Sequence, residues 1–506
     1  METKSFTKEF EIMRNAEAKS NAFTHAMGIM MYDAETVAPE KSAEGRAHTF
    51  GVLAELEYRM MTEKELSDAL EVLSEHKDEF SEYEQREIEL TSKKIGEVAK
   101  IPQNEYIEMV VLRDEATVAW KKAKDASDYS IFEPYLEKIV QSNIKLASYL
   151  HPEMQPYDCL LDMYEEGLTT EFCDDFFSKL RTGLLPIIEK VSKSPQIDDS
   201  FLHRPCSIEK QRSFSEKIVE MMGLDRTKLT LGEVEHPFTE NFNNSDIRLT
   251  THYYETDFVN NMFSVLHEGG HCMYEQNCDD IYNFTSFQGG VSMGIHESQS
   301  RFYENIIGRS REFSSCLLAS AKEYFPEQMS DINIEKFYKA INRAECGPIR
   351  LEADELTYCL HIMVRYEMEK RLISGALSVK DAPQAWNALY REYLGVTPEN
   401  DAVGILQDSH WAGGSIGYFP SYALGSAYGA QMLSFMKKDI PDLWETVSRG
   451  DLSVVTEWLR EHFHRHACYY PPKVLFEKTC GKFDPQYFID YLDKKYTEIY
   501  DLGGGF

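Results

Sequence analysis

The chain has 506 residues, 42% of them hydrophobic, so it is long enough to bury a large core. Its 85 acidic residues outnumber its 53 basic residues, which gives a formal net charge of −32. Proteins that bind nucleic acid or anionic membrane surfaces are normally basic, so this charge argues against both classes of partner.

Helical periodicity dominates the amino-terminal part of the chain. Apolar residues recur at spacings of three and four with charged residues between them, which is typical of long amphipathic helices. Pro39 and Pro102 interrupt the pattern, and Pro134 falls in a first helical turn, where a missing N–H costs little. The predicted helices are 4–30, 41–62, 63–76, 80–99, 104–126 and 132–151.

The composition changes between residues 227 and 254. The segments KLTLGEVEHPF (228–238) and DIRLTTHYYET (246–256) are rich in Thr, Val, Ile and Tyr, and an Asn-Asn-Ser turn (243–245) separates them. This pattern predicts a short sheet. The free edge of a strand can hydrogen-bond an extended peptide, so such a sheet would suit a peptide-binding site.

The pentapeptide HEGGH follows at 267–271. On a helix, His267 and His271 lie on the same face, so their imidazoles can bind one metal ion. Glu268 would lie close to that ion without binding it, where a carboxylate can accept a proton from the attacking water of a metal hydrolase. Gly269 and Gly270 each cost a helix interior about 1 kcal/mol relative to Ala, which indicates that another segment packs closely here.

A third ligand is expected, because a catalytic zinc ion usually has three protein ligands. Residues 293–304 are predicted to form a second helix, and Glu297 within it follows His271 by 26 residues. The connecting loop contains Gly289 and Gly290, which would allow the chain to turn back. We therefore predict that Glu297 completes the site.

Helices are predicted again over 333–373 and 381–394 and at the carboxyl end of the chain. Between them lies a segment rich in Gly, Ser and Tyr at 413–429. A glycine and a proline bracket the aromatic residues of GYFPSY, which argues against a continuous helix and would allow Tyr418 and Tyr422 to face a ligand. The alternative is a packed aromatic turn.

A second histidine pair four residues apart occurs in EHFHRH, at 461–466. His462 and His466 could share a helix face, but no carboxylate motif accompanies them. We interpret the segment as a surface or interface cluster, with adventitious metal binding as the alternative.

Several features bear on compartment and domain organisation. The amino terminus has no basic region followed by an apolar core, no stretch approaches 18 apolar residues, and the ten cysteines lack Cys-x-x-Cys spacing. These features predict a cytoplasmic protein with reduced thiols. Without a clear linker, we predict one domain (1–506), with an amino-terminal helical lobe over about 1–150, a catalytic region over about 225–430 and carboxyl-terminal helices over about 430–506.

Six motifs resemble the carboxypeptidase Taq family of metallocarboxypeptidases and stand in the order found there. They are HPF (236–238), DIRLT (246–250), HEGGH (267–271), GIHESQS (294–300), IRLEADE (349–355) and GYFPSYALG (417–425). The segments YDAETVAPE (32–40), YDCLLDMYEEGLT (157–169) and LQDSHWAGG (406–414) are also similar to that family, so the resemblance covers nearly the whole chain.

The resemblance implies a mainly α, elongated multi-helix fold with a deep active-site cleft and a small β-sheet at the cleft wall. It also implies a homodimer that removes single residues from peptides with a free C-terminus, with broad preference and one Zn²⁺ ion per subunit, Co²⁺ being possible. Carried over by position, His267, His271 and Glu297 become the metal ligands and Glu268 the general base.

A carboxypeptidase must also bind the free α-carboxylate of its substrate, and a guanidinium can bind both of its oxygens. Arg350, in IRLEADE, is the first candidate, and Arg248, in DIRLT, is the second. Alternatively, Arg350 forms a structural ion pair with Asp354, four residues later on the same predicted helix.

Candidate donors to the oxyanion are Tyr418, Tyr422 and His236. His236 precedes a proline and is biased towards extended backbone, and its alternative role is that of a core histidine. His296 is expected to pack or to support Glu297.

Departures from the family pattern occur in the 279–290 loop and at Val37, and they put substrate preference in doubt. Two alternative functions are a metallo-oligopeptidase that cuts internal bonds and an inactive helical metal-binding scaffold. The base Glu268 disfavours the scaffold, because a structural metal site does not need it.

Overall fold

A computed structural model describes residues 5–503 of the chain. The chain folds into two compact units, each built from three separate segments. Unit 1 comprises Met1–Ile101, Cys206–Val291 and Asp451–Pro471, and unit 2 comprises Pro102–Pro205, Ser292–Gly450 and Pro472–Phe506. Both units are mainly helical, and the sheet lies in unit 1. The prediction of a mainly α-helical protein with a small sheet is confirmed.

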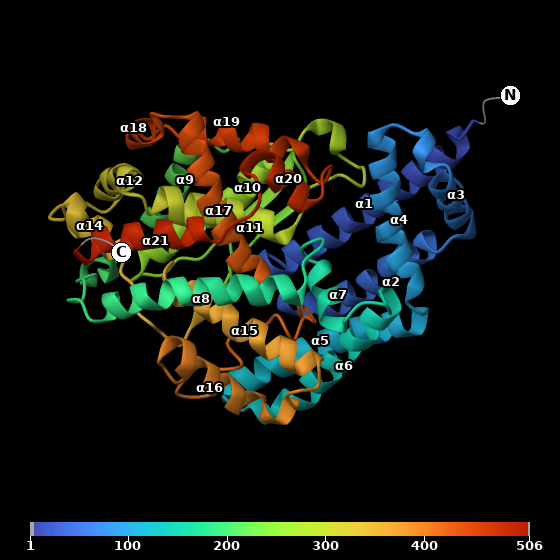
Figure 1. The fold of residues 1–506 in the computed structure, drawn as a ribbon, viewed down its shortest axis with the longest axis horizontal. Helices are drawn as coiled ribbons and strands as arrows, with labels where there is room; N and C mark the ends of the chain where they lie inside the picture. The colour runs from blue at the N-terminus through green and yellow to red at the C-terminus, as the bar shows by residue number, and fades with distance from the viewer. Residues whose placement is uncertain (1–4, 504–506) are drawn as a thin grey trace. The chain divides into compact units, whose positions relative to one another are not determined.

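Four long helices begin unit 1. They are α1 (Thr7–Thr36), α2 (Ala43–Met61), α3 (Lys64–Glu75) and α4 (Glu82–Lys100), with short 3-10 turns at Glu40–Ser42 and Lys77–Glu79. The first helix packs against the second and third (blue in Figure 1). Their apolar stripes meet in a buried core that includes Phe10, Met13, Leu66, Leu73 and Ile88. The predicted helices of this region are confirmed, except that Lys4 lies outside the described residues.

The sheet has three strands, β1 (Leu229–Glu233), β2 (Thr239–Asn243) and β3 (Asp246–Thr251), in the order β1-β3-β2. The central strand β3 runs parallel to β1 and antiparallel to β2. The sheet was predicted, but β2 was not, because TENFN has no clear apolar alternation. Pairing with β3, as between Glu240 and Arg248, accounts for its extended conformation. The edges belong to β1 and β2, so the predicted DIRLT strand has no free edge.

The HEGGH segment lies on α10 (Phe258–Gln276), as predicted. The helix begins at Asp257, whose side chain accepts a hydrogen bond from the N–H of Asn260, and it packs against α9 (Ile208–Met222) and β3. A Cβ atom on Gly269 would lie 2.5 Å from the sulfur of Met222. This close approach explains the glycine. Unit 1 also contains a short turn at Asp280–Tyr282, α19 (Ser453–His462) and a turn at His464–His466.

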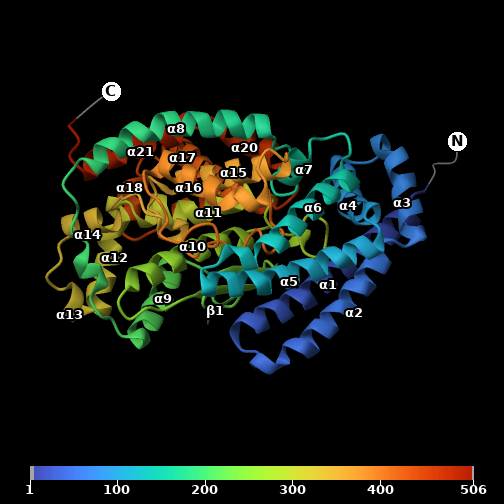
Figure 2. The same cartoon turned by 90° about the horizontal axis from the view of Figure 1, so that it is seen from below.

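The described residues of unit 2 form helices and connecting turns but no strand. Its α-helices are α5 (Gln103–Ala126), α6 (Glu133–Leu150), α7 (Pro156–Asp162), α8 (Thr170–Ser192), α11 (Met293–Arg301), α12 (Arg311–Tyr324), α13 (Pro326–Met329), α14 (Ile334–Ile341), α15 (Tyr358–Ile373), α16 (Ala382–Leu394), α17 (Pro420–Asp439), α18 (Leu443–Ser448), α20 (Pro472–Cys480) and α21 (Gln486–Ile499). Shorter 3-10 turns lie at Tyr129–Ile131, Ser200–His203, Arg350–Glu352 and Val379–Asp381. The pairs α5–α6 and α8–α21 lie side by side (Figures 1 and 2).

Two predicted helices of unit 2 differ from the structure. The helix predicted over 293–304 is α-helical only to Arg301 and continues as a π-helix over Phe302–Gly308. The helix predicted over 333–373 is broken between Ile341 and Tyr358, where Gly347 and Pro348 occur, because proline lacks the N–H that a helix interior needs. Within residues 5–503, no helix is both long and apolar enough to cross a bilayer.

Candidate metal centre

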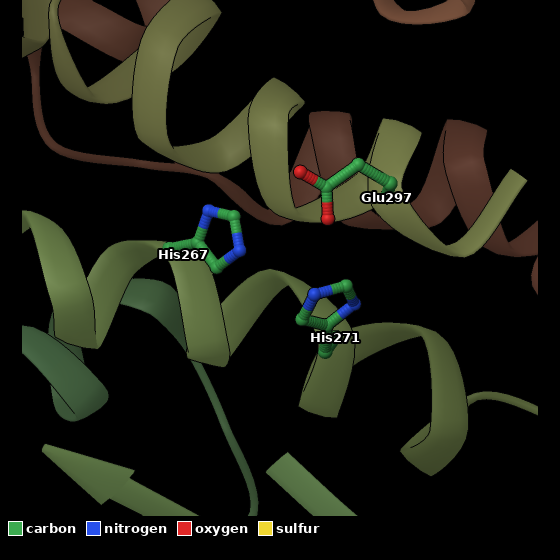
Figure 3. A group of neighbouring side chains, drawn as sticks. All are labelled: His267, His271 and Glu297. Carbon is green, nitrogen blue, oxygen red and sulfur yellow. The ribbon is translucent and has the colours of Figure 1, made fainter. Parts of the chain in front are cut away.

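Three of the predicted residues meet in the arrangement that a metal ion needs. His267, His271 and Glu297 each offer one ligand atom, and these atoms lie within 4.8 Å of one another. The two imidazole rings are 5.1 Å apart, and the carboxylate extends toward them (Figure 3). Two imidazoles and one carboxylate form a donor set that zinc uses in hydrolases. The donor atoms and their arrangement are therefore suited to binding the divalent metal ion that the sequence predicts.

The carboxylate of Glu297 is buried and held by its own helix. Nε of Arg301 donates a hydrogen bond of 2.7 Å to Oε1, and the hydroxyl of Ser300 donates one of 3.0 Å to Oε2. Arg301 in turn lies over the ring of Tyr358, with its guanidinium carbon 4.0 Å from the ring centroid, and pairs with Glu304. Such partners fix the orientation of a ligand and tune its basicity.

Helix α17 approaches Glu297 at a glycine. A Cβ atom added to Gly425 would lie 2.7 Å from Cβ and Cγ of Glu297 and 2.8 Å from its carbonyl carbon. Real Cβ atoms almost never approach other atoms so closely, and backbone atoms cannot easily move away. The packing of α17 along α11 therefore depends on glycine at this position.

We expect Gly425→Ala to displace Glu297 and to weaken zinc binding by about tenfold or more, the range seen when the supports of metal ligands are lost. Competition with a chromogenic chelator measures the Kd for zinc. Gly429→Ala is the matched control, because the nearest atom to its Cβ would be the flexible tip of Ile306, at 3.2 Å, and the backbone would be no closer than 3.6 Å. Both changes raise helix propensity equally, so equal zinc affinities in the two variants would contradict this explanation.

The predicted base, Glu268, is 8% exposed and bonded to the sheet. The hydroxyl of Thr239, the first residue of β2, lies 2.6 Å from its Oε2. Its neighbour on the helix, Cys272, is buried, and burial raises the pKa of that thiol well above its ordinary value. A thiol that stays protonated packs against its neighbours rather than binding a metal ion.

Arg350 is buried and does form an ion pair, but not with Asp354. Its Nε and Nη2 lie 2.9 and 2.8 Å from Oδ1 of Asp408, and Nη1 donates to the hydroxyl of Tyr358 at 3.0 Å. Asp354 instead accepts hydrogen bonds from backbone N–H groups at the start of α15. The predicted alternative for Arg350 was therefore wrong in its partner, because the expected helix is broken there.

Asp408 is shared by two guanidinium groups. Nη2 of Arg365 lies 2.6 Å from its Oδ2, opposite Arg350. Burial alone would raise the pKa of Asp408, but the two arginines hold it well below its ordinary value. One carboxylate balances only one of the two cations, so these three buried groups carry an excess positive charge.

Tyr418 and Tyr422 lie together beside Arg350. Their ring centroids are 5.1 Å apart, the hydroxyl of Tyr422 lies 3.1 Å from Nε2 of His410, and the ring of Tyr422 faces the Arg350 guanidinium. Burial, followed by the charge of Glu297, raises the pKa of Tyr418, and burial raises that of Tyr422. Both hydroxyls therefore stay protonated and can donate hydrogen bonds.

GYFPSY is not a continuous helix, as predicted, because its first three residues precede α17. Helix α17 begins at Pro420, so Tyr422 lies in its first turn. Proline suits this position, because its fixed φ matches the helix and its missing N–H is not needed there.

The remaining candidates lie in unit 1. His236 is exposed in the loop between β1 and β2, and is therefore neither a strand end nor a core residue. Arg248, on β3, pairs with Asp246 at 2.6 Å and lies over the rings of Tyr32 and Phe242.

The EHFHRH histidines have separate partners. Nδ1 of His462 lies 2.8 Å from the carbonyl oxygen of Trp458, His464 is buried against Tyr274, and His466 packs on Tyr470. Among the described residues they do not form a cluster of metal ligands.

Comparisons with known proteins show the family of the chain. The family model described as carboxypeptidase Taq (M32) metallopeptidase matches residues 12–496. The chain belongs to this family. It is 40% identical to carboxypeptidase 1 of Bacillus subtilis (strain 168), over 99% of this chain and 100% of that protein. It is 37% identical to thermostable carboxypeptidase 1 of Pyrococcus furiosus, over 94% and 96%. A solved M32 carboxypeptidase from Deinococcus radiodurans R1 is 32% identical and superposes with a TM-score of 0.94, over 98% and 100%.

As an M32 metallopeptidase, the protein is a metal-dependent carboxypeptidase with peptide substrates. Family membership therefore disfavours both the oligopeptidase and the inactive scaffold. Sequence reasoning missed the residues that hold the candidate site residues in place, namely Thr239, Arg301, Arg365 and Asp408. Arg301 could have been found from its i+4 spacing to Glu297, and Asp408 lies in the noted LQDSHWAGG motif. Spacing alone gave no signal for Thr239 or Arg365.

Proposed function

We propose that the enzyme releases single amino acids from the carboxyl ends of peptides, with broad preference, using Zn²⁺ bound by His267, His271 and Glu297. The observation that carries the proposal is the set of three donor atoms within 4.8 Å, next to the carboxylate of Glu268. A divalent ion at this site would polarise the scissile carbonyl and lower the pKa of the attacking water. Co²⁺ suits the same donors and is the alternative ion.

Glu268 acts as the general base and then as the general acid. The hydroxyl of Thr239 donates a hydrogen bond to Oε2 and so fixes the orientation of the carboxylate, which accepts the proton of the attacking water. The same carboxyl then delivers this proton to the nitrogen of the leaving amino acid. The hydroxyls of Tyr418 and Tyr422, with His236 as a further candidate, donate hydrogen bonds to the developing oxyanion.

Arg350 binds the α-carboxylate of the substrate. The excess positive charge of the Arg350, Arg365 and Asp408 group supports this role, since an incoming anion would balance it. Arg248 is the second candidate, although Asp246 already balances its charge. The protein is further proposed to be a cytoplasmic homodimer, which rests on the family resemblance, and light scattering in solution tests the dimer.

A mixture of peptides with free and amidated carboxyl ends, digested and read by mass spectrometry, tests the activity. We expect stepwise loss of single residues from the free peptides and no cleavage of the amidated ones, because the anchor needs a carboxylate. Internal cleavage of both sets at equal rates would overturn the proposal in favour of an oligopeptidase.

The same mixture separates the two anchor candidates. Arg350→Ala should raise the KM for free peptides by about ten- to a hundredfold, as expected when a charge-assisted contact of about 1.5–3 kcal/mol is lost. Arg248→Ala serves as the comparison and should leave KM nearly unchanged. The opposite result would move the anchor to Arg248.

A further inference from the structure

Glu165 is a buried carboxylate outside the proposed catalytic groups. It lies in the turn between α7 and α8, and only 3% of it is exposed. In the part of the chain that the structure describes, its donors are the N–H of Gly294 at 3.0 Å and the hydroxyls of Ser292 and Tyr428, the latter at 3.3 Å. Two of these donors belong to the start of α11, the helix that carries Glu297.

Two of the first three N–H groups of α11 donate hydrogen bonds to this segment. The first N–H groups of a helix have no partner within the helix and must find acceptors elsewhere. Met293 donates to the carbonyl oxygen of Tyr164 at 3.1 Å, Gly294 to Glu165, and Ile295 to the Ser292 hydroxyl at 3.2 Å. A carboxylate at this end also faces the positive end of the helix dipole.

The contact requires glycine at position 294. A Cβ atom there would lie 2.6 Å from Oε2 of Glu165, so any larger residue would push the carboxylate away from the N–H. Tyr428 belongs to α17, which packs along α11 and contacts Glu297 through Gly425. Glu165 therefore joins the two helices that surround the predicted metal ligand.

Burial raises the pKa of Glu165 to about 7, although its neutral hydrogen-bond donors act in the opposite direction. A buried carboxyl group without a cationic partner is costly, and such groups can be kept because they specify one arrangement of the chain. The arrangement specified here is the position and rotation of the first turn of α11. Glu297 lies three residues after Gly294, on the next turn of this helix.

We propose that Glu165 is a positioning residue for the metal centre: by fixing the start of α11, it sets the direction from which Glu297 reaches the ion. The inference rests on the proposed function, because it takes Glu297 as a metal ligand. None of the three donors to Glu165 is itself a proposed metal ligand or catalytic residue.

The test compares Glu165→Gln with Glu369→Gln in the full-length enzyme. Glu369 is a matched control, since it is also buried, its pKa is also raised to about 7, and it accepts from the N–H of Gly417, the indole of Trp411 and the hydroxyl of Tyr157. None of these donors lies on α11. Glutamine at position 165 keeps the size of the side chain but replaces one acceptor oxygen with an N–H₂ group, which would face hydrogen-bond donors.

Zinc affinity by chelator competition and the melting temperature of the metal-free protein are measured for both variants. We expect the melting temperatures of the two variants to change by similar amounts, but the zinc Kd to rise only in Glu165→Gln. The expected rise is about tenfold, the lower end of the range seen when a residue that supports a metal ligand is replaced. The kcat should fall in that variant with little change in KM. An unchanged zinc Kd in Glu165→Gln, or an equal rise in Glu369→Gln, would overturn the inference.

A second variant keeps the test decisive if Glu165→Gln does not fold. Gly294→Ala retains the charge but displaces the carboxylate, and it should raise the zinc Kd in the same direction. Glu297→Gln separates the two proposals. If this variant binds zinc as tightly as the wild-type protein, the proposed metal centre is wrong. If it binds zinc less tightly but Glu165→Gln and Gly294→Ala do not, only the proposed role of Glu165 is wrong.

Discussion

Replacing Glu268 with glutamine is expected to lower kcat on peptides with a free carboxyl end by about 10²- to 10⁴-fold, the contribution of a general acid–base. The amide has the same size and can still accept the hydrogen bond from Thr239, so the fold and the ligands should be preserved. It cannot accept a proton from water or return one to the leaving nitrogen. The loss should therefore appear in kcat rather than in zinc content, measured by amino-acid release and by metal analysis.

Glu275→Gln provides the control for this experiment. Glu275 lies on the same helix, is also buried, and accepts a hydrogen bond from the N–H of Gly290 at 2.9 Å. Its replacement removes a buried carboxylate of α10 without removing the base, so kcat should change by only a few-fold. Near wild-type kcat in a zinc-loaded Glu268→Gln enzyme would rule out the acid–base role.

Removing the metal is the second change with a very large expected effect. Dialysis against a chelator should abolish peptide hydrolysis, and one equivalent of Zn²⁺ per chain should restore it, because the Lewis acid is part of the reaction. His271→Ala leaves two ligands of the three. This variant should bind zinc more than about a hundredfold less tightly, which exceeds the effect of losing a residue that only supports a ligand. Its peptide hydrolysis should not recover when one equivalent of Zn²⁺ is added.

The other histidine pair is the internal control for the metal experiment. The double variant His462→Ala and His466→Ala should retain one ion per chain and full recovery, since these side chains bond and stack within their own segment. If the double variant bound less than one zinc ion per chain while His271→Ala still bound one, the ion would bind at the second histidine pair and not at the proposed ligands.

The meeting of His267, His271 and Glu297 could be predicted from the sequence. The two histidines share a face of one helix whatever surrounds it, and Glu297 lies on a second predicted helix that follows a glycine-containing loop. The resemblance to the family then added Arg350 and the tyrosines. The helical amino-terminal region was equally accessible, because its apolar spacing has one strong period.

The supports of the site could not be predicted, because they depend on pairs of segments far apart in the chain. Thr239 meets Glu268 only because TENFN becomes a strand beside DIRLT, and its own composition does not favour a strand. Arg365 meets Asp408 across 43 residues, and Gly294 is visible as a necessity only when Glu165 is in place. Such contacts are properties of the folded chain and not of any local pattern.

Because Arg350 and Arg365 share Asp408, the binding of acidic peptides should depend on salt in a particular way. The surface of a protein with a formal charge of −32 repels them from a distance, and dissolved salt at physiological ionic strength largely screens this repulsion beyond about 8–10 Å. Solvent ions do not reach the buried guanidinium groups in the same way. Under the proposed role of Arg350, rising salt weakens the long-range repulsion more than the attraction for the terminal carboxylate, so we expect hydrolysis of acidic peptides to gain more than that of neutral ones.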